Sequence, residues 1–201
     1  NYWLFGEEYN LVAADERLDT VLNKYLNYLD KYNTTGVAYT DPQYRARRPD
    51  IFISSMRDVV TPDGNQQENI IVELKAPHVQ LTFDVYRQIE DYMRAVKKDP
   101  EFNSVYVNWK FISVCTELSQ DIIEKINSRK DKGKKGLADQ ESNYEIYAYT
   151  WADVFTMFDI RHRHLYGKLQ KVHSSLYYGD AGREKANALT KDIMEMSFQA
   201  K

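Results

Sequence analysis

The feature that most constrains the fold is a pair of apolar segments separated by a turn signal. The first segment covers residues 47–53 and the second covers residues 69–75, with Thr61-Pro62-Asp63-Gly64 between them. Turn chemistry of this kind, flanked by Ile, Val and Phe, predicts two antiparallel strands joined as a hairpin. Residues equally far from the turn face each other in a hairpin, so Asp50 is expected at the same end as Glu73 and Lys75.

The end of this hairpin combines charges that suit metal chemistry. Side chains alternate along a strand, so Glu73 and Lys75 are expected on one face, while Val72 and Leu74 point into a core. The carboxylates of Asp50 and Glu73 would repel each other without a cation between them, and such hard oxygen donors suit Mg²⁺ or Mn²⁺. Lys75 would stand beside the metal, where it can orient a water, help deprotonate it, or balance phosphate charge.

The order of these motifs resembles that of a known family. Pro49-Asp50, followed by Glu73-Leu74-Lys75 at the end of an apolar strand, resembles the PD-(D/E)xK nuclease superfamily. The segment 88–92, which begins with Gln and ends with Tyr, looks like the Gln-apolar-x-x-Tyr element of RecB-like branches. The opening residues 3–9, taken with the later motif, look like the nuclease domain of Shedu-type antiphage defence proteins. The matching motifs cover roughly the first half of the chain, and their joint order carries the resemblance, since Glu-x-Lys alone is common by chance.

The resemblance implies an α/β fold with a restriction-endonuclease-like core, in which helices flank a central mixed sheet. It also implies a metal-dependent nuclease that hydrolyses phosphodiester bonds, with DNA as the expected substrate. In that mechanism Asp50 and Glu73 hold Mg²⁺ (or Mn²⁺), Lys75 positions or activates water, and Gln88 assists. Tyr92 is expected to pack in the core rather than to act in catalysis.

The first helix of the superfamily often adds an acidic residue to the site. Three carboxylates are available for this role near the start of the chain, namely Glu7, Glu8 and Glu16. Glu8 ranks first because it lies in the Shedu-like motif. An ordinary exposed glutamate is the alternative for each of the three.

Nucleic-acid binding would depend on local basic patches, because the net charge of −3 gives no global attraction to phosphate. Arg45, Arg47 and Arg48 directly precede Asp50 and are expected to neutralise the nucleic-acid backbone at the mouth of the site. A second basic run is either another phosphate contact or a solvated loop, and both readings stay open. It comprises Lys125, Arg129, Lys130, Lys132, Lys134 and Lys135.

Composition and length set the broad class of the protein. With 201 residues, 43% hydrophobic and 28% charged, the chain is long enough to bury a substantial core. It has no apolar run of membrane-spanning length and no signal peptide, so a cytoplasmic protein without a membrane partner is expected. A single cysteine, Cys115, excludes an internal disulfide and a multi-cysteine zinc site, and it is expected in the core. The missing initiator Met suggests an excised domain, which a neighbouring sensor or ATPase domain would regulate.

Residues 1–150 are predicted to form the nuclease core. The patterns predict helices starting at the N-cap Asp15 and over 81–98 and 119–125, with strands over 37–39, 104–116 and 144–149. The near-continuous apolar run in 104–116 predicts a central strand covered on both faces. The first helix has its apolar stripe at Leu18, Val21, Leu22, Tyr25, Leu26 and Leu29, and the second at Val85, Ile89, Tyr92, Met93 and Val96.

Residues 151–201 are predicted to form a C-terminal helical extension, broken near 177–182. Its apolar residues predict either packing on the core or a homodimer. They are Leu165, Leu169, Leu176, Leu189, Ile193 and Met196. His162 and His164 do not predict a shared metal site, because a spacing of two residues splays them by about 200° around a helix.

A different class of function stays open beside the nuclease. The chain could be a noncatalytic nucleic-acid-binding or assembly domain in which the charged centre serves only the structure. Other catalytic patterns are absent from the sequence, including a phosphate-binding Gly-rich loop and a nucleophile elbow. The combination of Asp50, Glu73 and Lys75 favours the nuclease, because burying two carboxylates beside a lysine is costly without a functional reason.

Overall fold

The computed structural model describes residues 9–29, 42–61, 64–98, 102, 107–129 and 133–177. Contacts within the chain divide it into two units, Asn1–Phe155 and Thr156–Lys201. The predicted strand over 37–39 and the candidate residue Glu8 lie outside the described residues.

The first unit is an α/β structure built on a six-stranded mixed sheet. The strand order is β1-β2-β3-β5-β8-β7, in which β3, β5 and β8 are parallel and the other pairings are antiparallel. These strands are β1 Asn10–Ala14, β2 Ile51–Thr61, β3 Gly64–Leu74, β5 Val107–Cys115, β7 Leu137–Glu141 and β8 Tyr144–Thr150. Two short strands, β4 Gln80–Leu81 and β6 Glu117–Leu118, form a separate parallel pair. The helices are α2 Leu18–Leu29, α3 Phe83–Lys98, α4 Gln120–Asn127 and α5 Trp151–Tyr177.

The predicted hairpin is confirmed as the pair β2 and β3. Ile51 lies opposite Val72 at its open end, and Thr61 lies opposite Gly64 beside the turn. The central turn residues, Pro62 and Asp63, fall outside the described part of the chain. Because Asp50 directly precedes Ile51, this register brings it beside Glu73.

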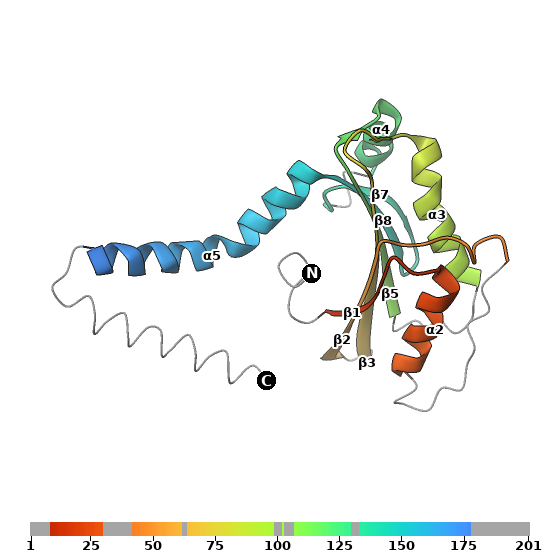
Figure 1. The fold of residues 1–201 in the computed structure, drawn as a ribbon, viewed down its shortest axis with the longest axis horizontal. Helices are drawn as coiled ribbons and strands as arrows, with labels where there is room; N and C mark the ends of the chain where they lie inside the picture. Colours follow the sequence, from red (N-terminus) through yellow and green to blue (C-terminus); the bar gives the residue numbers. More distant parts are fainter. Residues whose placement is uncertain are drawn as a thin grey trace. The chain divides into compact units, whose positions relative to one another are not determined.

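Helices α2 and α3 cover one face of the sheet (Figure 1). The predicted stripe of α2 is confirmed from Leu18 to Leu26, and all five of these described stripe residues are buried against the sheet. In α3 the predicted positions Ile89, Tyr92 and Val96 are buried, but Val85 and Met93 are only partly so. Tyr86 and Ala95 are buried instead, so the buried face of α3 is rotated by part of a turn from the predicted stripe. The rotation buries the large aromatic ring of Tyr86.

The start of α2 differs from the prediction. The helix begins at Leu18, and Asp15 is not its N-cap. Asp15 has a left-handed backbone, with φ of 48°, and its N–H donates to the carbonyl of Asp50 at 3.1 Å. The N–H of Leu18 donates to the carbonyl of Arg47 at 2.8 Å. Backbone carbonyls of Arg47 and Asp50 thus accept the hydrogen bonds of the N–H groups in this turn, in place of a capping side chain. These bonds also fix the segment before Asp50 against the start of α2.

Strand β5 is the central strand that its apolar run predicts. It lies between the parallel strands β3 and β8, and most of its side chains are buried. Cys115 is a buried free thiol, and its Sγ donates to the carbonyl of Glu117 at 3.2 Å. Its expected place in the core is therefore confirmed.

The outer strands among those described, β1 and β7, are short and irregular. Each has five residues. The pairing register shifts between Leu11 and Ala13 in β1, and between Leu137 and Asp139 in β7. Both shifts mark β-bulges or similar irregularities at the sheet edges.

The second unit begins within α5, at Thr156. His162 donates through Nδ1 to the carbonyl of Phe158 on the same helix, at 2.8 Å. This contact accounts for His162 without a metal, and the side chain of His164 is not among those described. Packing of the C-terminal helices on the core, or dimerisation through them, stays a prediction. In the described part of the chain, no helix combines the length and apolar character needed to cross a bilayer.

Candidate active site

Asp50 stands where β2 begins, beside the end of β3. Its Oδ2 accepts a hydrogen bond from the backbone N–H of Leu74 at 2.6 Å. Leu74 is the last residue of β3, so the Asp50 side chain completes the ladder where its neighbouring strand has ended. This bond holds the carboxylate next to Glu73.

Glu73 lies on the face of the sheet that α3 covers, and it is buried with 6% of its surface exposed. The prediction that Val72 faces a core is confirmed, whereas Leu74 is only partly buried. The prediction of one charged and one apolar face is wrong, because Glu73 is itself buried under α3. Ile71 and Glu73 share the helix-covered face, and Val72 is buried on the opposite one. Side chains alternate along β3 as predicted, but apolar residues are buried on both faces, so the charged residue is not on a solvent-exposed face.

Lys75 and Gln88 meet at Glu73. The Lys75 ammonium donates to Glu73 Oε1 at 2.8 Å and to Gln88 Oε1 at 2.7 Å. Gln88, from α3, donates through Nε2 to the same Glu73 oxygen at 2.7 Å. The backbone N–H of Lys75 donates to the carbonyl of Val114 at 2.8 Å, which fixes the main chain at this position. The structure thus brings together all four central residues of the predicted site.

Tyr92 is part of the same network. Its hydroxyl donates to Glu73 Oε2 at 3.0 Å and accepts from Gln88 Nε2 at 3.1 Å. Tyr92 is buried, as expected for a packing residue, but it also has a polar role that the sequence analysis did not assign. The signal was the spacing of four residues from Gln88, which puts both side chains on one side of the helix.

The electrostatics of the cluster follow from its burial. Burial raises the pKa of Glu73; the hydrogen bond and charge of Lys75 oppose this rise, and the charge of Asp50 adds to it. Burial, followed by the charge of Glu73, also raises the pKa of Tyr92. Tyr92 therefore stays a neutral donor, and Lys75 is the counter-charge for two interacting carboxylates.

Ser113 is a further polar residue that the sequence analysis missed. It pairs with Glu73 across the parallel strands β3 and β5, and it is buried. Its Oγ makes no hydrogen bond within the described part of the chain. A serine within the apolar run 111–115 was the available signal, and its place beside Glu73 emerges only from the register.

The side chains present fit a divalent cation held by two carboxylates. Mg²⁺ commonly binds through one or two carboxylates and completes its shell with waters and phosphate oxygens. Asp50 and Glu73 supply such oxygens, and the orphaned hydroxyl of Ser113 is a polar group beside them that a water could satisfy. Among the described residues no group of three or more His, Cys, Asp or Glu side chains could hold a metal. Glu73 would first have to give up its contact with Lys75.

The predicted extra carboxylate is not found among the described residues. Glu7 and Glu8 lie outside the described residues. Glu16 forms an ion pair with Lys24 at 2.5 Å, on the exposed side of α2. This ion pair accounts for the Glu16 carboxylate without a role in the site.

The basic residues before Asp50 are not equivalent. The Arg47 guanidinium forms an ion pair with Asp91 of α3 at 2.7 Å, which ties this segment to the helix carrying Gln88. Arg45 and Arg48 are exposed beside it.

The second basic run is largely neutralised where it is described. Its three described lysines and its one described arginine all pair with carboxylates, which favours a structural role over a free phosphate-binding patch. The pairs are Lys125 and Arg129 with Asp139, Lys134 with Glu145, and Lys135 with Asp153.

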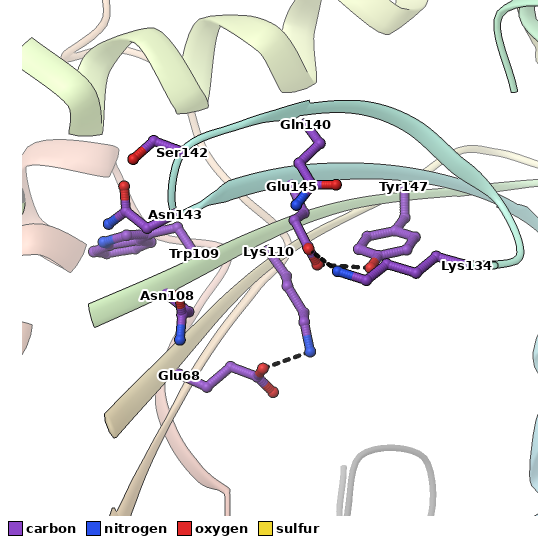
Figure 2. Close-up of a pocket in the computed structure, with 10 residues that line it drawn as sticks. All are labelled: Glu68, Asn108, Trp109, Lys110, Lys134, Gln140, Ser142, Asn143, Glu145 and Tyr147. Carbon is purple, nitrogen blue, oxygen red and sulfur yellow. Dashed lines mark hydrogen bonds and ion pairs between the residues drawn. The ribbon is translucent and has the colours of Figure 1, made fainter. Parts of the chain in front are cut away.

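A pocket of about 360 Å³ lies on the opposite face of the sheet. Figure 2 shows Glu68 and Lys110 pointing toward each other there, away from α3, and their side chains pair at 2.5 Å. Nearby, Tyr147 donates to Glu145 Oε2 at 2.6 Å. Glu68 precedes Glu73 by five residues on β3, or about 16 Å at 3.3 Å per residue. This pocket is therefore separate from the Asp50 site.

Comparison of the chain with family models, with curated proteins and with solved structures finds no match. The functional conclusion therefore depends on the geometry around Asp50, Glu73, Lys75 and Gln88.

Proposed function

We propose that this chain is a metal-dependent nuclease domain that hydrolyses phosphodiester bonds, with DNA as its substrate. The observation that carries the proposal is the convergence of Asp50, Glu73, Lys75 and Gln88 from three separate segments of the chain. A chance occurrence of Glu-x-Lys in the sequence gives no reason for a distant Asp and a helical Gln to meet it.

Each residue has a role that its contacts support. Asp50 and Glu73 would hold Mg²⁺ or Mn²⁺, which supplies Lewis acidity and lowers the pKa of a bound water. The Lys75 ammonium can donate to the attacking water or to a phosphate oxygen. Gln88 orients Lys75 and Glu73 together, and Tyr92 holds the second oxygen of Glu73.

Substrate binding would come from local contacts, since the net charge is −3. Arg45 and Arg48 are exposed just before Asp50 and would meet the nucleic-acid backbone there. Arg47 would act differently, because its ion pair with Asp91 holds the segment in place.

The test is DNA cleavage by the intact protein. Cleavage should require Mg²⁺ or Mn²⁺ and should stop on chelation, whereas Ca²⁺ should bind without supporting good turnover. Asp50→Ala should weaken both metal binding and cleavage. The matched control is Asp84→Ala, whose exposed carboxylate pairs with Arg87 in the first turn of α3, and this variant should cleave like the parent. Cleavage that resists chelation, or that survives Asp50→Ala, would contradict the proposal.

The wider role proposed is antiviral defence, on the Shedu-like resemblance of residues 3–9 and the later motif. In that setting a neighbouring domain of a longer chain would regulate the nuclease. The cleavage assay is therefore best run on the full-length protein, and activity that is higher in the isolated chain than in the resting full-length protein would support such control.

A noncatalytic nucleic-acid-binding or assembly domain is the second candidate. It is favoured by one observation, namely that both oxygens of Glu73 and the Lys75 ammonium already find partners inside the chain. A fully satisfied buried network can stabilise a fold without any reaction. This alternative would be established if the protein binds DNA in fluorescence anisotropy but cleaves it with no metal tested. Lys75→Ala should then bind DNA as tightly as the parent.

A further inference from the structure

The Lys75 ammonium occupies the carboxylate that the proposed metal needs. Glu73 Oε1 accepts from Lys75 and Gln88, and Glu73 Oε2 accepts from Tyr92. Asp50 offers its Oδ2 to the N–H of Leu74. A cation that approaches the two carboxylates therefore meets a positive charge already in contact with one of them.

We infer that Lys75 and a divalent cation exchange at Glu73, so that metal binding releases the Lys75 ammonium toward the substrate. This inference rests on the proposed nuclease function and concerns the regulation of the same site. Two cations within a few ångströms of each other in a partly buried pocket repel strongly. Glu73 Oε1 already accepts from Lys75 and Gln88, so a cation that binds this oxygen competes with the ammonium.

The contacts allow this exchange with little rearrangement. The ammonium has a second acceptor, Gln88 Oε1 at 2.7 Å, so it can leave Glu73 and keep a hydrogen bond. Gln88 is itself held by Tyr92 at 3.1 Å when its bond to Glu73 is lost. The backbone of Lys75 stays fixed to Val114, and only the flexible end of the side chain has to move.

Charge balance explains what the exchange would achieve. Asp50, Glu73 and Lys75 together carry a formal charge of −1, which favours a cation and disfavours a phosphate. A bound divalent cation changes the sum to +1, which matches the single negative charge of a phosphodiester. Binding of the metal would thus convert the centre from one that repels nucleic acid into one that attracts it.

Isothermal titration with Mn²⁺ in mildly alkaline buffer tests the inference. Lys75→Met removes the ammonium and keeps most of the side-chain length. Mn²⁺ should then bind on the order of tenfold more tightly, because it no longer has to displace the charge-assisted hydrogen bond from Lys75 to Glu73. Lys110→Met, whose lysine pairs with Glu68 on the opposite face (Figure 2), is the matched control and should bind Mn²⁺ like the parent. Asp50→Asn should weaken binding in either background, which assigns the signal to this site.

The parent protein gives an independent measurement if Lys75→Met does not fold. The ¹⁵N signal of the Lys75 ammonium, assigned by its loss in Lys75→Arg, should shift during a Mg²⁺ titration with the same midpoint as metal binding. The signal of Lys110 should not follow it.

The outcomes separate the inference from the proposed function. Equal or weaker Mn²⁺ binding in folded Lys75→Met, or a Lys75 signal that ignores the metal, overturns the exchange and leaves the nuclease proposal standing if the parent cleaves DNA. A parent protein that binds no metal and cleaves no DNA overturns both.

Discussion

Strand β3 carries two glutamates that pair with lysines in different surroundings. Glu73 pairs with Lys75 under α3, where the side chains are 8% and 10% exposed, and Gln88 and Tyr92 add hydrogen bonds. Glu68 pairs with Lys110 across to β5 on the other face, where the side chains are 20% and 31% exposed.

The difference shows how a covering helix changes the chemistry of the same residue types. Under α3, each oxygen of Glu73 meets a fixed donor, and burial raises the pKa of the carboxyl. Removing one member leaves the other in a site that water does not readily fill. On the opposite face, beside the pocket, water can replace a lost partner of Glu68 or Lys110. Substitution of either residue is therefore expected to cost little stability.

The largest expected difference between the two pairs is in catalysis. Lys75→Ala should lower the rate of Mg²⁺-dependent DNA cleavage by about a thousandfold, because it removes a preorganised donor at the reacting phosphate. Lys110→Ala should stay within about twofold of the parent, because its pair is remote from the site. Initial rates of plasmid nicking measure both. If Lys75→Ala cuts as fast as the parent, the activity belongs elsewhere and the binding-domain alternative gains.

Double-mutant cycles should separate the pairs in stability. For Glu73 and Lys75 we expect a coupling free energy of unfolding of about 2 to 3 kcal/mol, because the pair is shielded and shares a network. For Glu68 and Lys110 we expect less than about 1 kcal/mol. Denaturant unfolding of the single and double alanine variants gives both values. Equal coupling energies would mean that α3 does not set the difference.

Two tyrosines sharpen the comparison further. Tyr92→Phe and Tyr147→Phe each remove a hydroxyl that donates to a glutamate, so each should cost about 1 to 2 kcal/mol of unfolding free energy. Only Tyr92→Phe should also slow cleavage, by about tenfold, because Tyr147 contacts Glu145 on the other face. Thermal unfolding and cleavage rates, measured on the same samples, check this split. A cleavage defect in Tyr147→Phe would contradict this prediction, because it would show that the face of the sheet carrying Glu145 also affects the Asp50 site.

The smallest effect should be a change of stability with pH. The folded pKa of Glu73 lies above its ordinary value, so the unfolded chain loses this proton first as the pH rises. The stability linked to this proton is present below the ordinary pKa and is lost as the pH rises through the folded pKa. Glu73→Gln cannot titrate, so its stability relative to the parent should increase with pH across this window. A relative stability that falls with pH would show that Lys75 outweighs burial.

The sequence was sufficient for the elements with strong periodic patterns. The stripe of α2, the hairpin and the central strand β5 follow from spacing and turn chemistry, and so does the meeting of Asp50 with Glu73. The facing of β3 did not follow, because residues such as Ile70 and Ile71 make both of its faces apolar. Only the position of α3 decides which face receives Glu73.

Other features depended on distant contacts that no local pattern reports. Strands β1 and β7 are short and bulged, and each exists through pairing with a neighbour. The sequence pattern predicts Asp15 as a helix cap, but backbone carbonyls from the segment ending at Asp50 accept the hydrogen bonds of that turn. Ser113 joins the site through the register of β5, and the rotation of α3 follows from the burial of Tyr86.

The irregular outer strands restrict how copies of this protein can associate. A regular outer strand offers a row of unpaired backbone groups on which a second sheet can continue. In β1 and β7 the register shifts break this row within five residues, so a continuous intermolecular sheet across either strand is disfavoured. Association through the outer edges of this sheet is then expected to use side-chain surfaces rather than backbone pairing.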